Sequence, residues 1–430
     1  MMLLTSVVGL LFALMLCGIP LAFALAFAGS VGLYAIGGSG LLFGILKTAP
    51  LSSAGIFELL TIPMFMLMAE FVILSGIADN LFRAAAIWVG RIPGGLGVAT
   101  ALAGAGFGAI SGSSTAAAAT LSATTLPSMM RAGYPPRIAT GAVAISGTLA
   151  MLIPPSVAIV LYGLIANQSI GELLIAGIVP GVLVALVIAG TVVFLVLISG
   201  TQRPESRGYS WREKIASLKV VGPMVVLFIM VTGVIYMGVA TPTEAASLGA
   251  FGALILAWSE GRLSWPRLKE ATSRAANTTC MIMLVLMAAG IFSYFFTLTG
   301  VTQELVAWIR TLEVSRWTVL VLILAIYIVL GCFLDQISVL ILTVPITLPI
   351  VTALGFNPIW FGILVIVTAE LGMVTPPVGL NVFVVARYSG MPTEEVFIGV
   401  WPHIVAHILL LAVLVAWPQI ILWLPLTMMK

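Results

Sequence analysis

Residues 369–381 read AELGMVTPPVGLN, and residues 147–159, which lie 222 positions earlier, read GTLAMLIPPSVAI. Each stretch places two successive prolines inside a long apolar segment. Proline has no backbone N–H and its ring clashes with the preceding helical turn, so a proline doublet interrupts an α-helix. Two interrupted helices at matching positions indicate that the chain contains two related units.

Further residue pairs follow the same offset of 222 positions. They are Pro20 with Pro242, Leu126–Pro127 with Leu348–Pro349, Gly133 with Gly355, and Pro136 with Pro358. An offset of 224 aligns Leu74, Gly76 and Leu81 with Leu298, Gly300 and Leu305, so a two-residue length change separates the blocks. We therefore interpret residues 1–217 and residues 218–430 as two structural repeats.

The composition excludes a soluble globular protein. Hydrophobic residues make up 61% of the 430 residues and charged residues only 8%, whereas about 25% of the residues of an ordinary soluble protein are charged. Apolar runs of membrane-spanning length recur along the sequence, which predicts an all-α polytopic protein embedded in a lipid bilayer. The net charge of +3 comes from short loops, so there is no basic patch for a nucleic acid.

The apolar segments, bounded by Gly, Pro and charged residues, predict the membrane spans. Spans are expected near residues 3–17, 20–36, 55–76, 137–165, 170–199, 219–239, 243–258, 275–299, 358–386 and 397–426. Two of these, 137–165 and 358–386, contain the proline doublets and are expected to be broken helices.

Two further apolar stretches, 92–131 and 316–354, carry polar or small residues at their midpoints. The midpoint sequences are SGSST at residues 111–115 and LDQIS at residues 334–338. Each stretch is about two half-spans long, and turning the backbone at membrane depth requires a cavity lined by protein or water. We predict a re-entrant helical hairpin in each repeat.

The basic residues predict the orientation of the chain, because cytoplasmic loops collect Lys and Arg. With residues 200–219 placed inside, fourteen of the eighteen Lys and Arg residues fall inside, and Lys47, Arg310, Arg316 and Lys430 fall outside. Treating either hairpin as a single crossing would invert everything after it and remove this asymmetry. Both termini are then expected to face outward.

The flanks of the two hairpins differ in charge. The first hairpin is flanked by Arg91, Arg131 and Arg137, and the corresponding positions of the second are Glu313, Ala353 and Ile359. The second hairpin is therefore predicted to enter the membrane from the opposite side, which makes the two halves an inverted-topology repeat. Many secondary transporters have this architecture and bind their substrate near the membrane midplane, between the halves.

A hairpin tip and a helix break in each half predict a pair of binding sites. Carbonyls freed at a break, together with nearby hydroxyls, are hard oxygen ligands that suit a small cation. The N-termini of half-helices favour an anion. Ser113 and Asp335 correspond under the offset of 222, so one polar tip residue from each half is expected at the centre. We predict one cation site per half and an anionic substrate between them.

Several motifs resemble the large membrane subunit of the tripartite ATP-independent periplasmic (TRAP) transporters. They are IPMFMLMAE at 62–70, SGSST at 111–115, RAGYPP at 131–136, LIPPS at 152–156, FLD at 333–335 and AELGMVTPPVGLNVFV at 369–384. The resemblance covers essentially the whole chain. It implies a sodium-driven importer of the elevator type, with scaffold and transport parts interleaved between the repeats, and not an enzyme.

The same resemblance implies partners and a location. The partners are a small four-helix membrane subunit and a soluble periplasmic binding protein that delivers an organic acid. The location is the cytoplasmic (inner) membrane of a bacterium or archaeon. C4-dicarboxylates, sialic acid and similar carboxylates or sulfonates all suit this family, so the sequence leaves the substrate open.

The resemblance also implies positions for two or more sodium ions and for the substrate. The second sodium site falls on Gly331, Gly372, Thr375 and Val378, and pseudo-symmetry places the first around Ala109, Ser111, Ala150, Ile153 and Ser156. The substrate residues implied are Ser113, Ser114, Asp335 and Asn381. Asn381 either contacts substrate or caps backbone groups.

Two alternatives remain open at this point. A proton-coupled organic anion transporter would use Glu70 or Glu370, although the resemblance favours an orienting role for Glu370 beside the sodium site. An intramembrane serine hydrolase would use Ser111, Ser113 or Ser114, but both histidines lie far along the chain, on the last span. His403 and His407 lack a third metal ligand, so we assign them to packing or hydrogen bonding.

The remaining features concern packing and surfaces. Gly104 and Gly108 form a GxxxG motif that is expected to pack the two arms of the first hairpin together. Residues 78–89 and 302–312 mix charge with tryptophan, as helices lying along a membrane surface do. Outward loops near residues 37–54, 240–244 and 300–316 are candidates for contact with the binding protein, on topology alone.

Overall fold

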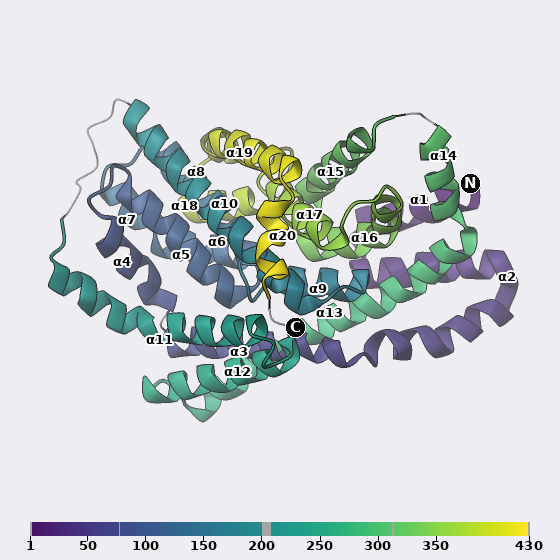
Figure 1. Cartoon of the computed structure of the whole chain (residues 1–430), viewed down its shortest axis with the longest axis horizontal. Helices are drawn as coiled ribbons and strands as arrows, with labels where there is room; N and C mark the ends of the chain where they lie inside the picture. Colours follow the sequence, from purple (N-terminus) through teal and green to yellow (C-terminus); the bar gives the residue numbers. More distant parts are fainter. Residues whose placement is uncertain (1, 77, 200–207, 312–313, 429–430) are drawn as a thin grey trace.

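The computed structural model describes residues 2–76, 78–199, 208–311 and 314–428, and all regular structure in these ranges is helical (Figure 1). The first half contains α1 (Met2–Leu16), α2 (Leu21–Ala54), η1 (Phe57–Leu60), α3 (Thr61–Ser75), α4 (Ala78–Val89), α5 (Gly95–Ser111), α6 (Ser114–Thr124), α7 (Leu126–Arg131), α8 (Pro136–Ser146), η2 (Gly147–Met151), α9 (Val157–Ala166) and α10 (Ile170–Ile198). The second half contains α11 (Trp211–Tyr236), α12 (Pro242–Ser259), α13 (Trp265–Thr299), α14 (Val301–Thr311), α15 (Arg316–Phe333), α16 (Gln336–Ala353), α17 (Pro358–Gly372), α18 (Leu380–Ser389), α19 (Thr393–Ala416) and α20 (Gln419–Leu426). Seven of the described helices are long and apolar enough to cross a membrane, so the all-α polytopic fold expected from the sequence is confirmed.

Polar side chains explain where several short helices begin. Ser113 precedes α6, Ser156 precedes α9 and Asp335 precedes α16, and each side chain accepts a hydrogen bond from a backbone N–H of the first turn. Such an N-cap replaces one of the hydrogen bonds that the first turn cannot form within the helix. A half-helix with this cap can begin inside an apolar environment.

The helices pack into two groups. The first, which we call the scaffold group, consists of α1–α3 and α11–α13. Within it α2 lies along α13, at the lower right of Figure 1. The hydroxyls of Thr61 and Thr243 lie 2.7 Å apart between α3 and α12. The second, which we call the hairpin group, consists of α5–α10 and α15–α20. The helices expected at 78–89 and 302–312 are present as α4 and α14, and they link the two groups.

Within the hairpin group the two halves interlock. Helix α8 of the first half packs against α19 of the second, and α17 of the second half packs against α10 of the first. Gly141 and Gly399 bring α8 and α19 so close that a Cβ at either glycine would overlap the backbone of the other helix. Arg137 donates two hydrogen bonds to Glu395 at 2.5 and 3.0 Å across the same contact.

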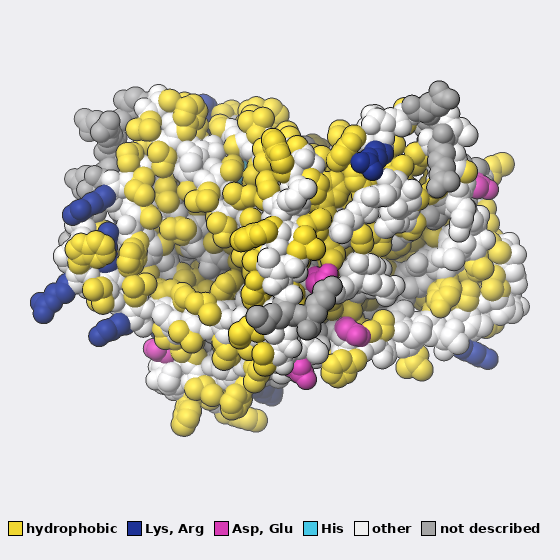
Figure 2. Space-filling view, in the orientation of Figure 1, with side chains coloured by type: hydrophobic (Ala, Val, Ile, Leu, Met, Phe, Trp, Pro, Cys, Tyr) yellow, Lys and Arg dark blue, Asp and Glu magenta, His cyan; other side chains and the backbone are white. Residues whose placement is uncertain are grey.

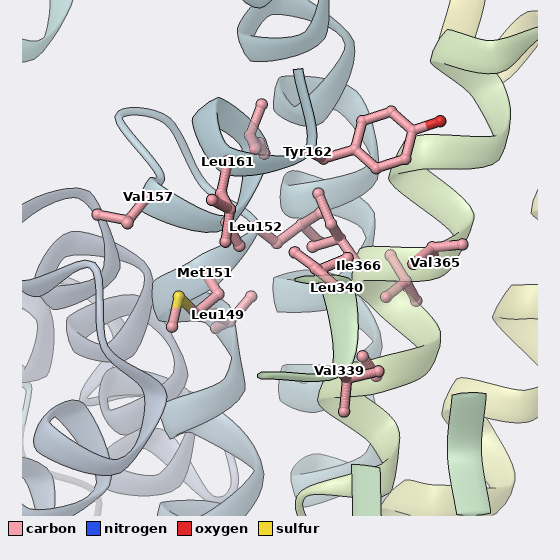
Figure 3. Packing of buried hydrophobic residues seen from close by; sticks show 14 of the residues in the cluster. Leu149, Met151, Leu152, Val157, Leu161, Tyr162, Val339, Leu340, Val365 and Ile366 are labelled. Atoms are coloured by element: carbon pink, nitrogen blue, oxygen red, sulfur yellow. The ribbon is translucent and has the colours of Figure 1, made fainter. Parts of the chain in front are cut away.

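The core between the halves is apolar. Side chains of α9 and the break before it, including Leu152 and Tyr162, face Leu340 of α16 and Ile366 of α17 (Figure 3). The Tyr162 hydroxyl leaves this core and donates to the carbonyl of Pro358 at 2.6 Å. In a lipid bilayer such a contact is stabilised by close van der Waals packing, and this core joins the two halves.

The surface is apolar over most of the face drawn in Figure 2, as expected for a protein surrounded by lipid. Lys and Arg side chains gather at the left edge of that view, beside α4 and α7. These helices belong to the segments that the sequence assigns to the inner side of the membrane. Arg203, Arg207 and Lys430, which also entered that assignment, lie outside the described residues.

Two predicted segments differ from the structure. Residues 37–54, expected as an outward loop, continue α2 after a kink at Gly37 and Gly38. Gly38 has a φ of 68°, in the left-handed region that glycine adopts without a steric penalty. The last predicted span, 397–426, is divided between α19 and α20, because Pro418 cannot donate the backbone hydrogen bond that would continue α19.

The GxxxG motif has a different partner from the one expected. Gly104 and Gly108 of α5 face the chain that follows the first hairpin and not its other arm. A Cβ at Gly104 would lie 2.5 Å from the carbonyl oxygen of Ser146, and one at Gly108 would lie 2.7 Å from that of Leu149. The two glycines therefore set the hairpin against η2, at the helix break.

The contact of α8 with α19 predicts the effect of adding one methyl group. Gly399→Ala places a Cβ against the Arg137 carbonyl and should destabilise the protein by about 1–3 kcal/mol. Gly190→Ala is the matched control, because Gly190 lies in α10 with open space around it. Thermal unfolding in detergent measures both variants, and equal unfolding temperatures would contradict the packing described here.

Candidate functional site

Each half contains a helical hairpin with a tight polar tip. In the first half α5 ends at Ser111, Gly112 has a φ of 56°, and α6 begins after Ser113. In the second half α15 ends at Phe333 and α16 begins after Asp335. Ser113 is half-buried and Asp335 is exposed. The two tips therefore lie where the midpoint sequences predict them.

Both proline doublets interrupt a helix, as expected. In the first half α8 passes into η2, which ends at Met151, and α9 begins after Ser156. In the second half α17 ends at Gly372, and α18 begins after Gly379, which has a φ of 58°. Segments of non-helical backbone thus separate two half-helices in each half.

Each hairpin touches the break of its own half through glycine. A Cβ on Gly372 would lie 2.6 Å from the Cα of Gly331, so α15 and α17 cross in backbone contact. The amide of Gly379 also donates to the carbonyl of Cys332 at 3.1 Å. In the first half a Cβ on Gly108 would lie 2.8 Å from the Cα of Ala150. The structure thus brings the first arm of each hairpin against the neighbouring break.

The residues implied for sodium binding lie at these two crossings. Gly331 and Gly372 are in contact, and Thr375 and Val378 follow within the same break. Ala150, Ile153 and Ser156 line the first break, whereas the side chains of Ala109 and Ser111 lie outside the described residues. Backbone carbonyls and hydroxyls at non-helical backbone are hard oxygen donors, which fit a small hard cation.

A buried polar cluster joins the two halves, and we call it the inter-repeat cluster. Ser114 at the start of α6 accepts a hydrogen bond from Asn381 Nδ2 at 2.8 Å and donates to Glu370 Oε2 at 3.4 Å. Asn381 Nδ2 also donates to the carbonyl of Ala144 at 3.4 Å. The exposed fractions are 1% for Ser114, 0% for Asn381 and 4% for Glu370.

The four residues implied for substrate binding therefore fall into two pairs. Ser114 and Asn381 are brought together, deep in the protein. Asp335 instead bonds the backbone N–H of Ser338 at 3.2 Å and also its hydroxyl, and Ser113 accepts from the amide of Ala116 at 3.4 Å. The tip residues thus contact their own helices in the conformation described.

Sequence reasoning missed Gln336, the first residue of α16. Its side chain is fully buried, and Nε2 donates to the carbonyl of Ile366 on α17 at 3.2 Å. The signal was available, since Gln336 follows Asp335 within LDQIS in an otherwise apolar stretch. A polar side chain that is buried among apolar residues needs hydrogen-bonding partners, and here the partner ties the second hairpin to α17.

The remaining titratable candidates have structural partners. Glu70 of α3 accepts a hydrogen bond from Arg274 of α13 at 2.9 Å, within the scaffold group. His407 Nδ1 lies 2.8 Å from the carbonyl of His403, and the described residues contain no group of three potential His, Cys, Asp or Glu metal ligands. Ser114 bonds Asn381 and Glu370, so the bonded partners of this serine are not those of a hydrolase triad.

Two cavities lie between the scaffold and hairpin groups. One has a volume of about 610 Å³ and is lined by residues of η1, the α9–α10 connection and the α11–α12 connection, including Glu58, Glu172 and Thr241. The other, of about 340 Å³, lies between α9, α16 and α13. Asn167 lines both. Cavities therefore line part of the boundary between the two groups.

Comparison with known proteins identifies close similarities over nearly the full length. Residues 8–420 match the family model described as the tripartite ATP-independent periplasmic transporter, DctM component. The chain is 34% identical over 372 residues to the C4-dicarboxylate TRAP transporter large permease protein DctM of Pseudomonas aeruginosa, covering 86% of each chain. It is 32% identical over 424 residues to the sialic acid TRAP transporter large permease protein SiaM of Vibrio cholerae, covering 97% of this chain and 96% of the other.

A solved structure shares the fold. The YdaH transporter of Alcanivorax borkumensis, described as having an unusual topology, superposes with a TM-score of 0.66 and covers 89% of each chain at 14% sequence identity. At that identity the likeness concerns the fold alone.

The inter-repeat cluster predicts the cost of removing one hydroxyl. Ser114→Ala leaves Glu370 Oε2 without its buried donor and removes one of the two acceptors of Asn381 Nδ2, and it should cost about 1–3 kcal/mol of stability. Ser122→Ala is the control on the same helix, because its hydroxyl bonds only the carbonyl of Ala118 one turn earlier. Thermal unfolding compares the two, and a smaller loss for Ser114→Ala than for Ser122→Ala would contradict the cluster.

Proposed function

Because the chain belongs to the DctM family of tripartite ATP-independent periplasmic transporters, we propose that it is the sodium-coupled permease subunit of an importer for an organic acid. The observation that carries this proposal is the pairing of a hairpin tip with a broken helix in each half. The pairing supplies hard oxygen donors for a cation beside helix N-termini that favour an anion.

We propose that two or more sodium ions are bound, at least one in each half. The proposed ligands are Gly331, Gly372, Thr375 and Val378 in the second half, and Ala109, Ser111, Ala150, Ile153 and Ser156 in the first. Support comes from the glycine crossings, which place each hairpin against its break. A cation beside the substrate favours binding of an anion, and by linkage the anion favours the cation by the same factor.

We propose that the substrate lies between the two tips, near Ser113 and Asp335, with Ser114 and Asn381 behind the first tip. The N-termini of α6 and α16 begin at these positions, and their backbone N–H groups suit a carboxylate or sulfonate. Asp335 would meet a bound cation or the hydroxyls of a substrate and not its acid group. Relatives named for C4-dicarboxylate and for sialic acid support the class of organic acids.

The proposed motion is of the elevator type. The halves 1–217 and 218–430 each contribute helices to both the scaffold group and the hairpin group. The hairpin group would move as a unit against the scaffold group, with α4 and α14 as the connections. Support comes from the close packing inside each group and from the cavities of about 610 and 340 Å³ along their boundary.

We propose two protein partners and a location from the family. A small four-helix membrane subunit would cover part of the scaffold group within the cytoplasmic (inner) membrane. A soluble periplasmic binding protein would deliver the organic acid to the outer face, near residues 37–54, 240–244 and 300–316. Residues 240–243 border the 610 Å³ cavity, which supports contact at that place.

Proton coupling through Glu70 or Glu370 is the alternative, and one observation weighs against Glu70. Glu70 is ion-paired with Arg274 in the scaffold group, so a proton on Glu70 would not travel with the hairpins. Only Glu370 remains for that mechanism.

The proposal predicts a specific loss in transport by the reconstituted complex. Thr375→Val should weaken apparent sodium affinity on the order of tenfold, since losing one ligand worth about 1.4 kcal/mol changes a binding constant by that factor. Asp335→Ala should abolish uptake. Thr368→Val is the control, because its hydroxyl also bonds a carbonyl one turn earlier on α17 but lies about one turn before the break.

The assay is uptake of radiolabelled organic acids into proteoliposomes with the binding protein present, with and without an inward sodium gradient. Uptake that a pH gradient drives in the absence of sodium would overturn the sodium coupling. Equal sodium dependence of Thr375→Val and Thr368→Val would overturn the assignment of the second site.

A further inference from the structure

We propose that the inter-repeat cluster is itself a cation site, in which Glu370 Oε1 and Asn381 Oδ1 hold a sodium ion separate from those at the two glycine crossings. The proposal rests on the sodium coupling proposed above and adds a third place for the ion. It would lie where α6 of the first half meets α17 and α18 of the second.

The hydrogen-bond census of the cluster shows what is missing from it. Both amide hydrogens of Asn381 are used, one on Ser114 and one on the carbonyl of Ala144. The single hydroxyl hydrogen of Ser114 is used on Glu370 Oε2. Glu370 Oε1 and Asn381 Oδ1 are both buried and have no hydrogen-bond partner among the described residues. Every donor hydrogen in the cluster is therefore used, and two acceptor oxygens have no donor.

The described ion pairs also leave room for a cation beside Glu370. The described ion pairs involve Arg137 and Arg274, and neither of them reaches Glu370. A buried carboxylate stays charged only beside a partner or a bound cation, because transferring it out of water unpaired is very costly. Two leftover oxygens, one of them on a carboxylate, need a positive ligand that brings no acceptor of its own. A sodium ion meets that need, and hard cations select oxygen ligands.

The position of the cluster gives the ion a part in assembling the substrate site. Ser114 directly follows the tip residue Ser113, and Asn381 lies in the first turn of α18, just after the second break. A third unpartnered buried oxygen, Gln336 Oε1, belongs to the residue after Asp335, and Gln336 bonds Ile366 one turn before Glu370. A cation here would pull the first tip and the second break together before the substrate binds.

Glu370→Gln is the decisive variant. Its amide nitrogen supplies hydrogens where the carboxylate had none, so the variant can satisfy Asn381 Oδ1 without an ion and should fold. We expect equilibrium binding of radiolabelled sodium to the purified complex of large and small subunits to fall by about one ion per large subunit. The rise of unfolding temperature with sodium concentration should be shallower than in the wild type, because a ligand stabilises the state that binds it.

The matched control is Glu70→Gln, which also removes a carboxylate from a membrane helix but leaves the hairpin group untouched. It should bind as much sodium as the wild type. In choline medium without sodium, Glu370→Gln should unfold at a temperature equal to or above that of the wild type, and the order should reverse at high sodium.

Two outcomes separate this proposal from the function on which it rests. Wild-type sodium binding that Glu370→Gln leaves unchanged would overturn the third site alone, and would indicate that a proton on Glu370 satisfies Asn381. Wild-type protein that binds no sodium at all would overturn the sodium coupling itself. A loss of one ion in Glu370→Gln together with retained binding in Glu70→Gln supports both.

Discussion

The backbone freed at the two proline doublets is the constraint on which the rest of the structure depends. A chain inside a membrane has no water to satisfy exposed N–H and C=O groups, so non-helical backbone persists there only where protein encloses it. Gly331 and Gly372 let α15 reach the second break, and Gly108 lets α5 reach the first. The hairpins therefore enclose the breaks and lie beside the proposed sodium sites.

The two halves contact each other closely within the hairpin group. Helix α8 of one half packs on α19 of the other through Gly141 and Gly399, and Tyr162 reaches across to Pro358. The inter-repeat cluster adds a polar link inside this apolar contact. Movement of one hairpin tip against the other would expose these groups, so the hairpin group is expected to move as one body. The two cavities described above lie on its boundary with the scaffold group.

The hairpin tips and helix breaks could be predicted from the sequence, because Pro154–Pro155, Pro376–Pro377, SGSST and LDQIS act locally on the backbone. The family resemblance could also be recognised from the sequence. The helix that packs against Gly104 and Gly108 could not be predicted, since a GxxxG motif shows that a helix is approached closely but not by which element. Residues 37–54 were misassigned because GGSG at 37–40 indicates a turn equally well as a kink. The bonds of Ser114 to Glu370 and Asn381 join residues more than 250 positions apart, and no local pattern encodes them.

We propose that the hairpin group moves as a rigid unit against the scaffold group. Spin labels at Leu248 of α12 and Val321 of α15, both exposed, measure the distance between the groups by pulsed electron paramagnetic resonance. Labels at Val321 and Ile408 of α19 measure a distance within the hairpin group, after the exposed Cys17 and Cys280 are replaced. We expect two populations of distances between the groups, which sodium and substrate redistribute, and a single unchanged distance within the hairpin group. One fixed distance between the groups under all conditions would contradict it.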